Sequence, residues 1–141
     1  MERRGEWYAG NDFDDLVEYL RSPQGDYPAD RVEQCRCSCG HTAFQLDVDD
    51  EQGCARRTCL SCRAAVLLAD SDDVWDDSDP GPAQCPCGGE RFEVGVGFSL
   101  QADDDIYWIT IAARCLGCGV LAVYADWKID YVPTAHLFAA V

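Results

Sequence analysis

The chain has 141 residues, 48% of them hydrophobic, which suits one or two small domains and excludes a chain that is disordered throughout. It carries 26 Asp and Glu residues against 11 Lys and Arg residues, a formal net charge of −15. This balance argues against nucleic-acid binding, which depends on Lys and Arg, and favours either simple solubility or a basic partner. Because no long apolar run and no apolar leader is visible, we expect a cytoplasmic protein without membrane segments.

The first predicted element is a helix over residues 11–22. Its apolar residues recur at steps of three and four, and Asn11 is a suitable N-cap, with acidic residues in the first turn. Pro23 ends the helix and opens a linker. The apolar stripe either packs on the rest of the chain or docks on another protein, and the sequence leaves both open.

The first cysteine-rich segment, QCRCSCGHTAF, runs from Gln34 to Phe44 and spaces three cysteines on alternate residues. A strand pattern (FQLDV), a turn (DDEQG) and a second strand pattern (ARRT) follow, which predicts a hairpin. The hairpin leads into a second cysteine pair, CLSC, at Cys59 and Cys62.

An acidic segment, Asp70 to Pro82, separates this unit from the next. It contains six acidic residues and no basic ones, so we expect part of it to be a mobile loop. Its Trp75 either packs on the protein, which we favour, or anchors a basic partner.

The second cysteine-rich segment, CPCGGERF, starts at Cys85. It leads into a longer predicted hairpin, FEVGVGFSL and IYWITIAA around the turn QADDD, and then into the pair CLGC at Cys115 and Cys118. GVLAVYADW predicts a third strand, and Thr134 is a candidate cap for a short terminal turn.

The two units match residue by residue. The first pair and its Gly40 and Phe44 recur 48 residues later, and Cys59, Leu60, Cys62 and Asp70 recur 56 residues later. Paired cysteine motifs at the two ends of a short hairpin resemble the zinc-ribbon family, over roughly residues 35–126. The departure from the family is that the first motif of each unit is C-x-C, where C-x-x-C is more usual.

The resemblance implies a small, metal-stabilised β protein, made of two tandem zinc ribbons of antiparallel hairpins and a short N-terminal helix. It implies two structural Zn²⁺ ions, each held by four thiolates in a closed tetrahedron that leaves no position for catalysis. The implied ligands are Cys37, Cys39, Cys59 and Cys62 for one ion, and Cys85, Cys87, Cys115 and Cys118 for the other.

Two cysteines lie outside this match. Cys35 is the spare of the first segment, because pairing it with Cys37 would put Ser38 where the motif has glycine, and Cys54 is best explained as a buried thiol. Alternatives remain open: iron in a rubredoxin-like Cys₄ site, disulfides including Cys35 to Cys54, and His41 in place of one cysteine.

These patterns predict an N-terminal helical arm and linker (1–34), a first zinc ribbon with the acidic loop (35–79), and a second ribbon with a C-terminal extension (80–141). No catalytic motif is present, so we expect a non-enzymatic, acidic protein-interaction module whose partner is a basic protein. The alternatives are an immunity-type protein or inhibitor that covers a basic nuclease, and, less favoured, electron transfer or nucleic-acid binding through Arg31, Arg36, Arg56, Arg57 and Arg63. The oligomeric state is not predictable.

Overall fold

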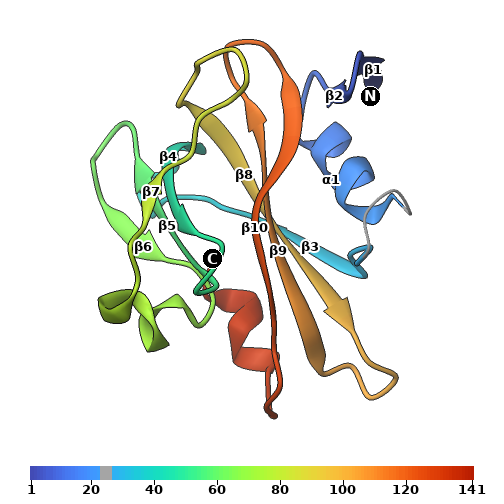
Figure 1. The fold of residues 1–141 in the computed structure, drawn as a ribbon, viewed down its shortest axis with the longest axis vertical. Coiled ribbons are helices and arrows are strands. Elements are labelled where there is room, and N and C mark those ends of the chain that lie inside the picture. Colours follow the sequence, from blue (N-terminus) through green and yellow to red (C-terminus); the bar gives the residue numbers. More distant parts are fainter. Residues whose placement is uncertain (23–26) are drawn as a thin grey trace.

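The computed structural model describes residues 1–22 and 27–141, and most of this chain forms one antiparallel sheet (Figure 1). The strands follow the order β1-β2-β10-β9-β8-β4-β5-β6, while β3 also pairs with β8 and β7 with β4. Their bounds are Glu2–Arg4 (β1), Trp7–Ala9 (β2), Arg31–Gln34 (β3), Ala43–Asp49 (β4), Cys54–Cys59 (β5), Ala65–Leu67 (β6), Gly81–Pro82 (β7), Phe92–Leu100 (β8), Ile106–Cys115 (β9) and Val120–Lys128 (β10).

Both predicted hairpins are present, as β4–β5 and β8–β9, and the predicted third strand is β10. Among the residues that the structure describes, the chain is therefore mostly β with one α-helix, as expected. The two hairpin units, although separate along the chain, are not separate in space. They join in one sheet, because β4 pairs with β8 at Ala43↔Glu93 and Phe44↔Phe92.

The pairing between the two units is reciprocal. Phe44 lies opposite Phe92, the residue 48 positions later that matches it in the sequence. The short strand that precedes each first cysteine pair joins the other unit: β3 pairs with β8 and β7 pairs with β4. Each pairing repeats the other after the same shift, since Glu33↔Val96 corresponds to Gly81↔Val48. Neither unit completes its sheet alone.

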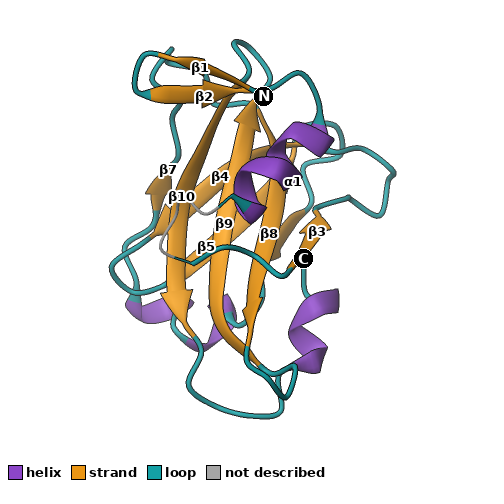
Figure 2. Cartoon of the chain, turned by 90° about the vertical axis from the view of Figure 1, so that its right-hand side faces the viewer, coloured by secondary structure: helices purple, strands orange, loops and turns teal. Residues whose placement is uncertain are grey.

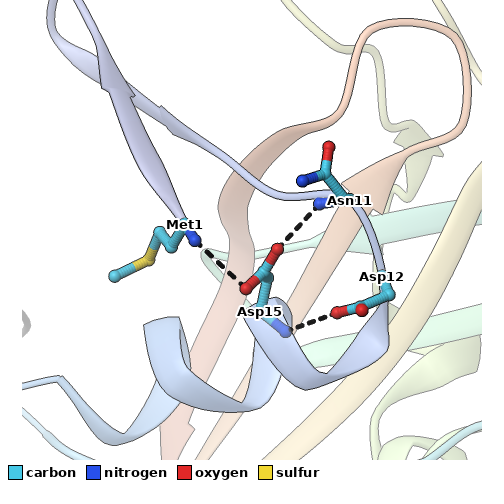
Figure 3. Close-up of polar contacts among 4 residues, drawn as sticks. All are labelled: Met1, Asn11, Asp12 and Asp15. Atoms are coloured by element: carbon cyan, nitrogen blue, oxygen red, sulfur yellow. Dashed lines mark hydrogen bonds and ion pairs between the residues drawn. The ribbon is translucent and has the colours of Figure 1, made fainter.

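The helix α1 spans Phe13–Arg21, and its N-cap is Asp12, so the prediction of Asn11 as the cap was wrong by one residue. The Asp12 carboxylate accepts a hydrogen bond from the Asp15 amide (3.0 Å), and the Asp15 carboxylate accepts in return from the Asn11 amide (2.8 Å) (Figure 3). This reciprocal arrangement satisfies the Asp15 amide, one of the free amides of the first turn, and the Asn11 amide just before the N-cap. The Asn11 amide, together with the amino group of Met1, lowers the pKa of the Asp15 carboxyl.

The apolar stripe of α1 packs against the protein's own sheet. Leu16 and Leu20 are buried against Ala112 and Leu121, and the helix crosses the face of β8 and β9 (Figure 2). Two glycines of β8 permit this close approach: a Cβ at Gly95 would lie 3.2 Å from the Phe13 ring. The opposite face of β8 carries large residues, such as Phe92 and Phe98, into the main core.

Two segments differ from the expected N-terminal arm and linker, whereas the C-terminal segment forms a short turn as expected. Residues 2–9 form the hairpin β1–β2, which extends the sheet beyond β10, and residues 31–34, expected to lie in or just after a linker, form β3. Residues 23–26 of the predicted linker lie outside the described residues. The C-terminal segment forms the 3₁₀ turn η3 (Ala135–Ala139), with Leu137 buried.

Thr134 precedes η3, but its hydroxyl does not cap the turn; it bonds instead to Asp105 and to the Ile106 amide. Within residues 1–22 and 27–141, no helix has the length and apolar character required to cross a membrane.

The burial of Leu16 predicts that α1 is integral to the fold. Leu16→Ala should lower the free energy of unfolding by about 2–5 kcal/mol, because it removes a fully buried side chain and leaves a cavity. Glu18→Ala, at an exposed position of the same helix, should change it by less than about 0.5 kcal/mol. Urea denaturation of both variants tests this, and equal values would mean that the helix is a detachable arm.

Candidate metal centres

The eight predicted ligands lie in two compact clusters. The first cysteine group is Cys37, Cys39, Cys59 and Cys62, and the second cysteine group is Cys85, Cys87, Cys115 and Cys118. Within each group the four Sγ atoms lie within 4.8 Å of one another, so each group could hold a metal ion. Each draws one pair from the loop before its hairpin, one cysteine from the last residue of the hairpin's second strand and one from the turn that follows.

The distances between sulfurs suit coordination and do not suit disulfides. They are 3.4 Å for Cys37–Cys62, 3.6 Å for Cys39–Cys59, 3.5 Å for Cys85–Cys118 and 3.7 Å for Cys87–Cys115. A tetrahedral ion with metal–sulfur bonds of ~2.3 Å separates its sulfurs by about 3.8 Å. A disulfide needs about 2.05 Å, and all ten cysteines are free.

The backbone forms the same turn around the first pair of each group. The Gly40 amide donates to the Cys37 carbonyl (2.8 Å), and the Gly88 amide donates to the Cys85 carbonyl (2.7 Å). Both glycines have φ near 90°, a conformation in which a side chain is strained, which explains the glycine at this place in both motifs.

The second pairs form matching turns as well. The Gly119 amide donates to the Cys115 carbonyl (2.8 Å), and the Arg63 amide donates to the Cys59 carbonyl (3.0 Å). Arg63 adopts a left-handed φ of 66°, so the first group keeps the turn although it lacks the glycine. A non-glycine residue in this conformation carries strain, and this turn is the least regular of the four.

Backbone amides directed at sulfur prepare the groups for a cation. The Cys39 amide is the main cause that lowers the pKa of the Cys37 thiol to about 6, and the Gly89 amide lowers that of Cys87 to about 7. Burial instead raises the pKa of Cys85. Four neighbouring thiols cannot all ionise without a positive charge among them, and a metal ion supplies that charge.

Side chains next to the cysteines hold the turns in place. Arg36 donates to the Gly40 carbonyl (3.3 Å), and Gln84, at the matching position, donates to the Gly88 carbonyl (3.2 Å). Arg4 reaches from β1 to the carbonyl of Cys118 (2.7 Å). Sequence analysis missed these three supports. Arg36 and Gln84 share a position but not a residue type, and Arg4 is remote in sequence.

The two remaining cysteines are core residues. The Cys35 amide donates to the Val94 carbonyl (3.0 Å), as the Ala83 amide donates to Leu46 (2.8 Å), so Cys35 occupies the place of a buried alanine. Burial raises the pKa of Cys35 to about 12, which keeps the thiol protonated. Cys54 is also fully buried, at the far end of β5.

His41 lies beside the first cysteine group but is not one of its four members. Its Nδ1 is 3.3 Å from the Sγ of Cys39, on an exposed turn. The four thiols of the group already provide a complete tetrahedral ligand set without the imidazole.

In comparisons with known proteins, no family model, no curated protein and no solved structure matches the chain.

The geometry predicts the metal content of the variants. Native mass spectrometry should find two Zn²⁺ ions per chain, and one ion after Cys62→Ser or Cys118→Ser, because each substitution removes a thiolate from one group. Cys35→Ala should keep both ions. Loss of an ion from Cys35→Ala, or a single ion in the unmodified chain, would contradict the assignment.

Proposed function

We propose that the protein is a non-enzymatic protein-interaction module, in which two structural Zn²⁺ ions stabilise the sheet and an acidic surface binds a basic protein. The observation that carries the proposal is the acidic segment between the units, which forms two 3₁₀ turns and is anchored to the sheet by hydrogen bonds. A negative surface of fixed geometry favours specific recognition over solubility alone.

Zinc is the metal that the ligand set favours. Four thiolates with no further donor form a closed site, which is typical of structural zinc and leaves no coordination position for a substrate. Rubredoxin-like iron uses the same ligands, but the C-x-C spacing departs from the paired C-x-x-C loops of that class. The matching turns and reciprocal pairing also support an internal duplication as the origin of the two sites.

The anchoring of the acidic segment begins at Asp70. Its carboxylate accepts hydrogen bonds from the indole of Trp127 (3.0 Å) and from the hydroxyl of Tyr131 (3.0 Å). The next residue, Ser71, is fully buried and bonds to the backbone of Leu68 and Ala55. The start of the segment is thereby fixed to the core.

Two 3₁₀ turns, η1 (Ser71–Asp73) and η2 (Trp75–Asp77), then present four exposed carboxylates to solvent. Trp75 is half-buried, and the guanidinium of Arg56 lies 5.0 Å from its ring centroid, so the indole packs on β5 as favoured. The exposed carboxylates are those of Asp72, Asp73, Asp76 and Asp77.

The contacts of the arginine side chains in and next to the first unit weaken the case for nucleic-acid binding. Arg57 is buried and donates to the Val141 carbonyl, and Arg56 pairs with Asp47 (3.1 Å). Arg31 pairs with Glu33 (2.7 Å), and Arg36 holds a cysteine turn. These four side chains serve internal contacts; Arg63 is exposed, but a phosphate backbone would need several arginines free on one open surface.

Removal of the metal should unfold the protein. A strong chelator under reducing conditions should abolish the cooperative thermal transition, because structural zinc contributes an apparent ~10–16 kcal/mol in small domains and neither unit completes its sheet alone. Differential scanning calorimetry with and without chelator provides the measurement, and re-addition of Zn²⁺ is the control. An unchanged transition in the metal-free protein would show that the ions are not structural.

Neutralising the acidic turns should weaken partner binding. A variant with Asp72, Asp73, Asp76 and Asp77 changed to Asn should lose at least about tenfold in affinity for the partner recovered from the native host, measured by calorimetry. The matched control changes four exposed acids elsewhere: Asp14, Glu18, Asp103 and Asp104. Equal loss in both variants would indicate nonspecific charge attraction, and a partner that is a basic nuclease would identify the protein as its inhibitor.

A further inference from the structure

A cavity of about 240 Å³ lies between the hairpin β1–β2, the strand β10 and the end of α1. It is on the same face of the sheet as α1, away from the acidic turns. Its walls combine aromatic rings with carboxylates, and among the lining residues, all of which the structure describes, none is Lys, Arg or His. The rings and carboxylates are those of Trp7, Tyr8, Tyr19, Tyr27, Glu6 and Asp126.

The rings come from separate segments and are held by contacts with one another. The ring of Tyr8 lies 6.2 Å from that of Tyr19, at 54° between planes, and Tyr27 stacks on Trp108 at 3.8 Å. Trp7 keeps 38% of its surface exposed and Tyr27 keeps 37%. Large aromatic groups left open at a concave site mark a binding surface more often than a packing defect.

The cavity also has an apolar floor. Leu121 is buried beneath it, and Val123, which is 44% exposed, extends the floor along β10. A ligand that combines an alkyl stem with a positive charge would match both parts, because the stem would lie on the floor while the charge faces ring faces and carboxylates. One such contact already exists within the chain, since the guanidinium of Arg3 lies 5.3 Å from the Tyr8 ring centroid and donates to its hydroxyl.

We infer that this cavity binds the cationic side chain of an arginine or lysine presented by the basic protein partner. The inference rests on the proposed function and deepens it, because it adds a specific anchor to the acidic surface. An anionic ligand would be repelled by the carboxylates of Glu6 and Asp126, and a purely apolar side chain would make no use of either charge. The Asp126 carboxylate also accepts a hydrogen bond from the Trp108 indole (3.3 Å), which holds it in place at the cavity.

The test uses the full, metal-loaded chain labelled with ¹⁵N and a short capped peptide, Gly-Ala-Arg-Ala-Gly. The matched probe replaces arginine by citrulline, which has nearly the same shape and no charge. The arginine peptide should cause saturable shifts of the backbone amides of β2 and β10 and of the Trp108 indole. Its affinity should exceed that of the citrulline peptide at least about threefold, the size of one exposed cation–π contact.

Substitutions locate the contact. Glu6→Gln should raise the Kd of the arginine peptide about threefold and Trp7→Leu about fivefold, since the first removes a carboxylate and the second a ring face but not the apolar volume. Asp76→Asn is the matched control, because it removes one exposed carboxylate outside the cavity and should change Kd less than about 1.5-fold. Unchanged amide signals away from the cavity establish that each variant is folded.

Equal binding of the two peptides, or shifts centred on the acidic turns, would overturn the inference. Equal effects of Glu6→Gln and Asp76→Asn on the Kd would overturn it as well. A further probe is the small cation tetramethylammonium: if it saturates the cavity while the arginine peptide does not bind, the inference is also wrong. Its failure is distinguishable from that of the proposed function. If the partner still depends on the acidic turns but ignores Glu6→Gln and Trp7→Leu, only the cavity assignment is wrong. If no protein partner exists and the arginine peptide still binds, the proposed function is wrong.

Discussion

The structure depends on the reciprocal pairing of its two halves at Phe44 and Phe92. These matched residues lie opposite each other where β4 meets β8, and both side chains are fully buried in the core. From that point the strands diverge, and each is completed by a short strand from the other half. The arrangement joins two small units, each too small for a large core of its own, into one continuous core.

The cysteine groups tie together turns at the ends of the paired strands. Each joins the loop that enters a hairpin to the turn at the end of that hairpin. In the first group, two of the four cysteines are exposed. The loops contain left-handed residues and few apolar side chains, so backbone bonds alone give them little stability. A bound ion would fix the two turns of its own group at once, and the reciprocal pairing joins both groups to the same sheet.

The sequence predicted the hairpins and the cysteine groups well because both leave local signals. Alternating apolar residues around Asp- and Gly-rich turns define β4–β5 and β8–β9, and the cysteine spacing is reinforced by its repetition. The strands β1, β2 and β3 were missed because they are short, and because β2 and β3 pair with β10 and β8, which lie far away in the chain. The N-cap was predicted at Asn11 and is Asp12, because both residue types are good caps and only the backbone geometry selects between them.

The sequence could not predict which segments pack against one another. The apolar stripe of α1 indicated burial without indicating the partner, which proves to be the glycine-bearing face of β8 together with β9. The aromatic cavity is assembled from residues between positions 6 and 126, and no periodicity connects them. Cys35 was separable from the ligands by motif spacing alone, but its equivalence to Ala83 depends on the cross-pairing.

The attachment of the N-terminal hairpin gives the second cysteine group an influence beyond its own turn. Arg4 bonds to the Cys118 carbonyl, and the Gly10 amide bonds to the Gly119 carbonyl (2.9 Å), immediately before the point where β2 joins β10. A Cβ at Gly119 would lie 2.8 Å from the Gly10 oxygen, so the fit tolerates little displacement. A metal ion held by this group would therefore also support, through these contacts, the hairpin that carries Trp7.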